Sequence, residues 1–208
     1  MSGGSPAAER IFYFDLASPL AYLAAERIQQ VLGGQDSSPI AWQPVLARDL
    51  PGASSSGSQS SGGVFANAKT SPRSAAELRA AVEGRAVRQG ALPLRWPPDF
   101  PFDSEQAMLV ATYAKSIGRA TAFAQAAFRQ AFAGGRSLAL SDNLVIAAAA
   151  CEMHPTAVLR GAGLDSVRRQ LHDATARAAD AGVGYVPAVQ VGSTVFVGDD
   201  APEQAAAG

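Results

Sequence analysis

The stretch IFYFDLASPLAYLAAERIQQVLG, residues 11–33, contains the signals of a strand, a tight turn and a helix. Residues 11–16 form a short apolar run rich in aromatic side chains, which favours a β-strand. Pro19 suits the first turn of a helix over 19–33, because the N–H that proline lacks has no partner there. Ser18 precedes that helix and is a natural N-cap. The chain therefore opens with a strand, a short turn and a helix.

The next segments extend this beginning into a sheet. A second strand is expected over 39–46, PIAWQPVL, which completes a βαβ unit of roughly 35 residues. Near the carboxyl end, PAVQV (187–191) and TVFV (194–197) flank a Gly-Ser pair, a pattern typical of a β-hairpin. The acidic, alanine-rich tail predicts one final helix with Asp200 near its N-cap.

The middle of the chain is helical almost throughout. Apolar residues recur at helical spacing between breaks at proline and glycine. The expected helices cover 74–90, 104–117, 119–133, 141–151, 155–161 and 164–181. A low-complexity stretch, GASSSGSQSSGG, precedes them.

These patterns predict an α/β fold. Residues 9–50 and 183–208 would form the α/β core, 51–72 a flexible Gly/Ser-rich loop, and 73–182 a large inserted all-helical subdomain. An insert of that size would cover one side of the sheet, and the crevice between the two is the expected ligand pocket.

Composition narrows the function classes. The 208 residues are 48% hydrophobic and 17% charged, with a net charge of −1 at pH 7, so no basic surplus favours nucleic acid. No apolar run reaches the roughly 18 residues of a membrane helix, so no membrane partner is expected. The N-terminus lacks the pattern of a secretory signal, and a cytoplasmic location is expected.

Cysteine and histidine limit the chemistry further. Cys151 is the single cysteine, so neither an intramolecular disulfide nor a CxxC motif can form. It is expected to be a small buried side chain. His154 and His172 are expected to be structural or on the surface, and no cluster has metal-ligand spacing. No metal is therefore expected.

Ser18 and the segment around Pro187 are the two features that could carry chemistry. Ser18 follows a strand and begins a helix, where free N–H groups and the helix dipole would stabilise a bound thiolate. It could equally be only a cap. Pro187 opens a strand and could be cis or trans.

Three segments resemble a known group of proteins. FYFDLASPLAYLAAERI (12–28), LPLRWPPDFPFDSEQAM (92–108) and GVGYVPAVQVGSTVFVGDD (182–200) are similar to the thioredoxin-like group that includes the disulfide oxidoreductase DsbA, 2-hydroxychromene-2-carboxylate isomerase and kappa-class glutathione transferase. Their order and spacing carry the resemblance. It implies a thioredoxin-like fold with a cis-proline before the hairpin.

The resemblance also implies a cofactor and a site. A serine in place of CxxC resembles the isomerase and kappa branch, where the hydroxyl binds the sulfur of glutathione and favours its thiolate. By resemblance, Ser18 would be catalytic, Val186 would offer backbone bonds to the thiol cofactor beside Pro187, and Asp200 would hold the γ-glutamyl amine. The cofactor would be glutathione or another low-molecular-weight thiol.

The chain departs from this group at several positions. Ala201-Pro202 follows the acidic turn, where the group often has arginine or serine. Asn67 and Lys69 are the nearest counterparts of the isomerase's asparagine and lysine. Asp103 stands where asparagine is common.

The resemblance implies a glutathione-dependent isomerase or transferase. Its substrate would be an aromatic or unsaturated electrophile, lying against Phe12, Phe100 and Phe102, and a homodimer would fit the group. One alternative is a non-catalytic binding protein of the same fold, in which Ser18 is only a cap. Another is a serine-hydrolase-like reaction, although no GxSxG motif is present to support it.

Overall fold

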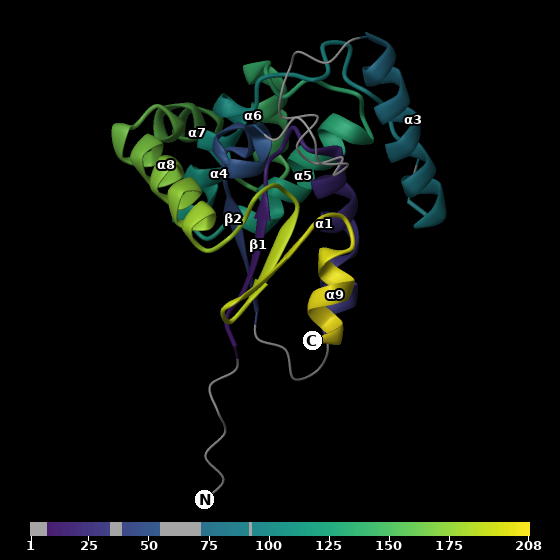
Figure 1. Cartoon of the computed structure of the whole chain (residues 1–208). Coiled ribbons are helices and arrows are strands. Elements are labelled where there is room, and N and C mark those ends of the chain that lie inside the picture. The colour runs from purple at the N-terminus through teal and green to yellow at the C-terminus, as the bar shows by residue number, and fades with distance from the viewer. Residues whose placement is uncertain (1–7, 34–38, 55–71, 92) are drawn as a thin grey trace, which may run out of the picture.

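A single four-stranded sheet in the order β2-β1-β3-β4 lies at the centre of the protein. The computed structural model describes residues 8–33, 39–54, 72–91 and 93–208. Figure 1 shows helices on both sides of the sheet and further helices gathered at its upper end, where β1 and β2 finish.

The first half of the sheet is the expected βαβ unit. It consists of β1 (Arg10–Phe14), α1 (Pro19–Leu32) and β2 (Ile40–Pro44). The two strands are parallel, with Phe12 opposite Trp42. Both strands end two residues earlier than the sequence predicted, because the chain leaves the sheet for a turn after β1 and for a 3₁₀ helix after β2.

The second half is the predicted hairpin, β3 (Ala188–Val191) and β4 (Thr194–Val197). Gly192 occupies the turn with φ of 59°, a left-handed conformation that glycine adopts without steric cost. β3 also pairs antiparallel with β1, with Tyr13 opposite Ala188. The hairpin thus extends the βαβ unit as expected for a thioredoxin-like core.

Helices fill the chain between β2 and β3, and one more ends it. They are α3 (Pro72–Arg88), α4 (Glu105–Ser116), α5 (Ala120–Phe132), α6 (Ser141–Ala149), α7 (Pro155–Ala162), α8 (Asp165–Asp180) and α9 (Ala201–Ala207). The predicted helices are confirmed, each boundary of the six internal ones lying within two residues of the expected position.

Two short 3₁₀ helices follow β2 and were not predicted: η1 (Ala47–Asp49) and η2 (Pro51–Ser54). Together with the start of α3, η2 falls within the segment 51–72 that was expected to be a flexible loop. Residues 55–71 of that segment lie outside the described residues.

Alternation along β1 sends side chains to both faces of the sheet. Phe12 and Phe14 belong to the larger buried cluster, in which the Phe14 ring lies 5.8 Å from that of Phe128 on α5. Tyr13 and Ile11 belong to a smaller cluster on the other face, which α8 covers. Phe12 is fully buried and packs edge-to-face against Trp42. Its expected place on the wall of a substrate crevice stays a prediction.

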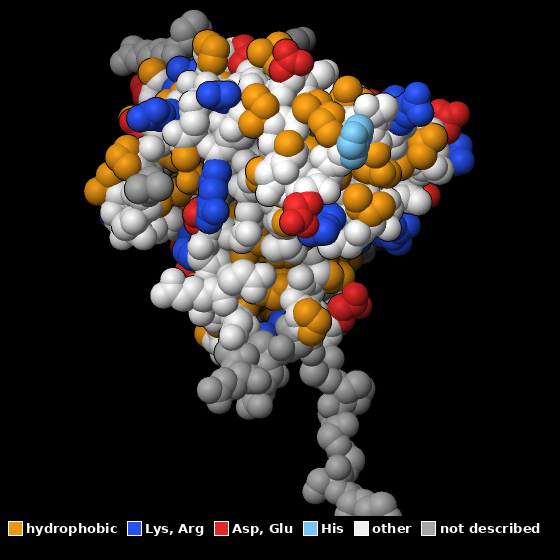
Figure 2. Space-filling model, turned by 180° about the vertical axis from the view of Figure 1, so that it is seen from behind, with side chains coloured by type: hydrophobic (Ala, Val, Ile, Leu, Met, Phe, Trp, Pro, Cys, Tyr) orange, Lys and Arg blue, Asp and Glu red, His pale blue; other side chains and the backbone are white. Residues whose placement is uncertain are grey.

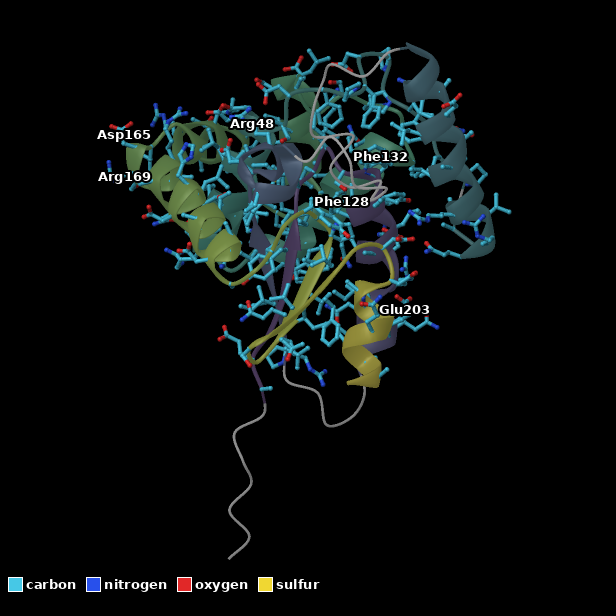
Figure 3. All side chains as sticks on the ribbon, viewed as in Figure 1. Arg48, Phe128, Phe132, Asp165, Arg169 and Glu203 are labelled. Atoms are coloured by element: carbon cyan, nitrogen blue, oxygen red, sulfur yellow. The ribbon has the colours of Figure 1, made fainter. Side chains whose placement is uncertain are left out.

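The sheet and the helical insert share one apolar core. The larger cluster includes Phe14 and Tyr22 from the α/β part, and Phe128 and Phe132 from α5. Tyr22 and Phe132 stack with ring centroids 5.7 Å apart. Figure 3 shows the two labelled phenylalanines in the interior, close to α1. The helices therefore hold the sheet through buried contacts rather than through surface pairs alone.

Candidate active site

Ser18 lies where β1 ends and α1 begins. Its backbone is extended, with φ −91° and ψ 111°, and its Oγ accepts a hydrogen bond of 3.2 Å from the backbone N–H of Ala21. This geometry confirms the predicted N-cap. Within the described part of the chain, the hydroxyl donates to no acceptor. Because a hydroxyl can accept and donate at once, the same group can cap α1 and donate to a ligand.

The segment Val186-Pro187 lies at the same end of the sheet as Ser18. Since β1 and β3 are antiparallel with Tyr13 opposite Ala188, the end of β1 lies beside the start of β3. The peptide bond between Val186 and Pro187 is cis, which confirms the cis-proline that the resemblance implied. Both residues are buried. The binding role expected of them stays a prediction.

The acidic turn before α9 is held by two arginines. Asp200 is exposed at the N-cap position of α9 and makes no cap bond. The carboxylate of Asp199 pairs with Arg85 of α3 at 2.9 Å. The carbonyl of Asp199 accepts a hydrogen bond from Arg27 of α1, which also pairs with Glu203 at 2.6 Å; Glu203 is labelled on α9 in Figure 3. Sequence analysis missed both arginines because they come from distant helices.

The remaining residues expected at the substrate pocket have different surroundings. Phe100 and Phe102 are 5% and 7% exposed, with ring centroids 6.2 Å apart, and belong to the core cluster. Their role as substrate walls stays a prediction. Asn67 and Lys69 lie outside the described residues.

Asp103 and Ser104 lie directly before α4, which begins one residue after the start expected at 104. Asp103 is exposed, and its Oδ1 accepts hydrogen bonds from the backbone N–H of Glu105 at 2.9 Å and from Arg48 at 3.0 Å. Ser104 occupies the N-cap position, but its side chain makes no cap bond. The capping carboxylate is therefore that of Asp103, which is also ion-paired. Its place in a ligand pocket stays a prediction.

Asp15 is a site residue that sequence analysis missed. Its carboxylate is buried, and Oδ1 accepts from the backbone N–H of Ala17 at 2.9 Å. Oδ2 accepts from the N–H of Ala47 at 2.9 Å and from the Ser104 hydroxyl at 3.0 Å. Burial raises the pKa of the carboxyl, while these donors and the Arg48 charge act in the opposite direction. An acidic residue directly after a buried strand was the signal, since buried carboxylates need partners.

The raised pKa of Asp15 makes the stability of the fold depend on pH. An unfolded aspartate titrates near about 3.9, so the folded state binds more protons between that pH and the higher pKa of the buried group. We expect the free energy of unfolding of the wild type, relative to that of Asp15→Asn, to fall as the pH rises through this interval. Urea unfolding of both proteins from pH 4 to pH 8 measures the difference. Asp173→Asn, at an exposed position on α8, is the control, and a difference that grows with pH contradicts the expectation.

Other parts of the described structure lie apart from these residues. A hollow of about 570 Å³ between α4 and α7 is lined by Tyr113, Arg160 and Leu164 among others, and includes none of the predicted site residues.

Cys151 is buried as expected, and burial raises the pKa of its thiol. Within residues 8–33, 39–54, 72–91 and 93–208, no group of three His, Cys, Asp or Glu side chains is arranged to hold a metal. Over the same ranges, no helix is long and apolar enough to cross a membrane. In Figure 2, charges of both signs are mixed with apolar side chains on the rear face.

The fold defines a thioredoxin-like protein of the DsbA type: it has a mixed four-stranded sheet, a cis-proline before β3 and a helix α1 that Ser18 caps directly after β1. The chain belongs to the family of the DSBA-like thioredoxin domain, whose model matches residues 11–207. The family includes isomerases and oxidoreductases. A comparison with curated proteins finds no match.

Solved structures agree with this assignment. A 2-hydroxychromene-2-carboxylate isomerase superposes with a TM-score of 0.75 at 19% identity, covering 95% of this chain and 92% of that one. A probable DsbA oxidoreductase from Streptomyces coelicolor has a TM-score of 0.71 at 18% identity, covering 95% and 86%. The oxidoreductase DsbA from Xylella fastidiosa has a TM-score of 0.57 at 13% identity, covering 98% and 84%. At these identities the likeness shows the fold.

Proposed function

We propose that this protein is a thiol-dependent isomerase or transferase of the DsbA-like family, similar to 2-hydroxychromene-2-carboxylate isomerase, with Ser18 as its catalytic residue. The observation that carries the proposal is the position of the Ser18 hydroxyl. The hydroxyl lies at the N-terminus of a 14-residue helix, at the end of the sheet where Val186 and cis-Pro187 also lie. Position 21, where a redox relative would have its second cysteine, is alanine.

The residues at this end of the sheet fit a small peptidic thiol. The hydroxyl of Ser18 would donate to the sulfur, and the positive end of the α1 dipole would favour the thiolate. The backbone of Val186 would bind the cysteinyl part, and the exposed carboxylate of Asp200 would bind the amine. Bound glutathione, or another small thiol, would supply a nucleophile that adds to an electrophilic carbon of an aromatic or unsaturated substrate.

The experiment that tests the proposal is a calorimetric titration of the purified protein with reduced glutathione. Saturable binding, together with thiolate absorbance near neutral pH, is the expected result. Absence of binding at millimolar glutathione would remove this thiol from the proposal. Other small thiols titrated in the same way would then decide whether any thiol binds.

A second function has one observation in its favour. Ser18 is only 6% exposed and its hydroxyl already caps α1, as in a non-catalytic binding protein of the same fold. In that case, glutathione binding would be absent, or would not depend on the Ser18 hydroxyl. The variants of Ser18 considered in the Discussion separate the two functions.

Replacing Asp200 by asparagine tests the binding end of the proposed site. If the carboxylate holds the amine of glutathione, its loss removes a charged hydrogen bond, and we expect the dissociation constant to rise about tenfold. The α9 helix should stay intact, since the side chain of Asp200 makes no cap bond. Asp142→Asn, at an exposed position in the first turn of α6, is the control. Equal affinities for all three proteins would exclude Asp200 from the site.

A further inference from the structure

The turn that presents Ser18 has every backbone donor engaged. The N–H of Leu16 donates to Sδ of Met108 at 3.2 Å, and that of Ala17 donates to Oδ1 of Asp15 at 2.9 Å. The N–H of Ser18 donates to the carbonyl oxygen of Asp15 at 3.0 Å. Two of these three acceptors belong to Asp15. This one residue therefore determines the path of the chain between β1 and α1.

The carboxylate of Asp15 also joins this turn to two distant segments. Oδ2 accepts from Ala47, at the start of η1, and from Ser104, before the first turn of α4. Asp15, Ser104 and Ala47 are all buried. Both carboxylate oxygens accept from N–H donors, whereas the amide of asparagine offers a single acceptor oxygen and would direct N–H₂ at a donor. The arrangement is thus specific for a carboxyl group.

A second layer of contacts joins the same two segments at the surface. Arg48 of η1 pairs with Asp103 at 3.0 Å and with Glu105 at 2.5 Å, and Arg168 of α8 pairs with Glu105 at 2.8 Å. Figure 3 shows Arg48 at the upper end of the sheet, where the helices gather. These pairs are solvent-exposed, so they contribute little. The buried carboxylate of Asp15 is the stronger connection.

We infer that Asp15 is the positioning residue of the Ser18 site. Its carboxylate fixes the turn that carries the Ser18 hydroxyl and fastens that turn to η1 and to the start of α4. The hydroxyl and the helical insert thereby keep one relative placement. The inference rests on the proposed function only for its effect on thiol chemistry, because the effect on the turn follows from the contacts alone.

Asp15→Asn and Ser104→Ala test this role, with Thr175→Val as the matched control. The hydroxyl of Thr175 is buried, accepts from the N–H of Leu46 at 3.0 Å and donates to Leu171 O at 2.9 Å. The control thus loses a buried bond to the peptide next to that of Ala47. Circular dichroism and thermal melting establish that each variant folds. Ser104→Ala keeps the charge of Asp15 and is the milder variant.

The first readout is the apparent pKa of the glutathione thiol bound to each protein, measured by thiolate absorbance. We expect it to rise by about one unit, a tenfold loss of thiolate, in Asp15→Asn, to rise less in Ser104→Ala, and to be unchanged in Thr175→Val. A carboxylate that acted only through its charge would disfavour the nearby thiolate, so removing it would lower this pKa. A fall in the pKa would therefore overturn the inference.

The second readout does not depend on any thiol. Amide hydrogen exchange at Ala17, Ser18 and Ala21 should be accelerated at least tenfold in Asp15→Asn and remain at the wild-type rate in Thr175→Val. Unchanged exchange in Asp15→Asn, or equal acceleration in the control, overturns the positioning role. If the wild type binds no glutathione, the proposed function fails, and the exchange data alone then decide the role of Asp15.

Discussion

Replacement of Ser18 by alanine should abolish formation of the glutathione thiolate while lowering the free energy of unfolding by only about 1 kcal/mol. The small loss of stability follows from the one bond that the hydroxyl makes within the described chain, the cap to Ala21 at 3.2 Å. The large loss of function follows from the proposed second role of the same hydroxyl, as donor to the sulfur. Thiolate absorbance and denaturant unfolding measure the two effects separately.

Two further variants separate the cap from the chemistry. Glycine is a good N-cap that costs only a few tenths of a kcal/mol relative to serine, yet it has no hydroxyl. Ser18→Gly should therefore be nearly as stable as the wild type and as defective in thiolate formation as Ser18→Ala. Ser18→Thr retains a hydroxyl and should preserve part of the thiolate signal.

The opposite pattern would support the non-catalytic function. If Ser18→Gly bound glutathione with wild-type affinity and the bound thiol had the wild-type pKa, Ser18 would be only a cap. A serine-reactive phosphonate offers an independent check. Labelling of Ser18 would favour a hydrolase-like reaction, and absence of labelling would count against it.

Phe128→Ala should cause a large loss of stability, about 3–5 kcal/mol. The Phe128 side chain is fully buried, with its ring 5.8 Å from that of Phe14 in β1 and 6.1 Å from that of Tyr22 in α1. Truncation would remove the contact between α5 and both elements and leave a cavity between them. Unfolding in denaturant, followed by far-UV circular dichroism, measures the loss.

The same experiment tests whether the insert and the sheet unfold together. Because one buried cluster contains side chains from both, we expect a single transition in the wild type and in Phe128→Ala. Leu140→Ala, at a position that is 59% exposed, is the control and should change the free energy of unfolding by less than about 0.5 kcal/mol. Separate transitions, or a loss in Phe128→Ala no larger than that of the control, would show that α5 does not join the two parts.

Local signals in the sequence were sufficient for the order of the strands and α-helices and for the Ser18 cap. Ser18 followed by Pro19 predicts a helix start because both effects act within one turn of chain. The hairpin was equally local, since Gly192 lies between two short strands. The cis-proline at Pro187 came from resemblance alone, because isomer preference is not set by neighbouring residues strongly enough to be inferred.

Long-range contacts decided the rest of the site. Asp15 lay within the strand expected over 11–16, and only the fold brings Ala47 and Ser104, 32 and 89 residues away, to its carboxylate. Phe12 was predicted for the pocket because aromatic residues suit both pockets and cores. Its burial depends on the helices that pack on its own face of the sheet, which only the fold brings there.

The sequence by itself thus determined which segments are strands and helices and where α1 begins, because hydrophobic periodicity and capping depend on neighbours in the chain. Only the tertiary structure decided the strand order β2-β1-β3-β4, the pairing of Arg85 with Asp199, and the two distant donors to Asp15, Ala47 and Ser104. These features depend on packing between segments far apart in the chain. There the removal of apolar surface from water, rather than local backbone preference, selects one arrangement.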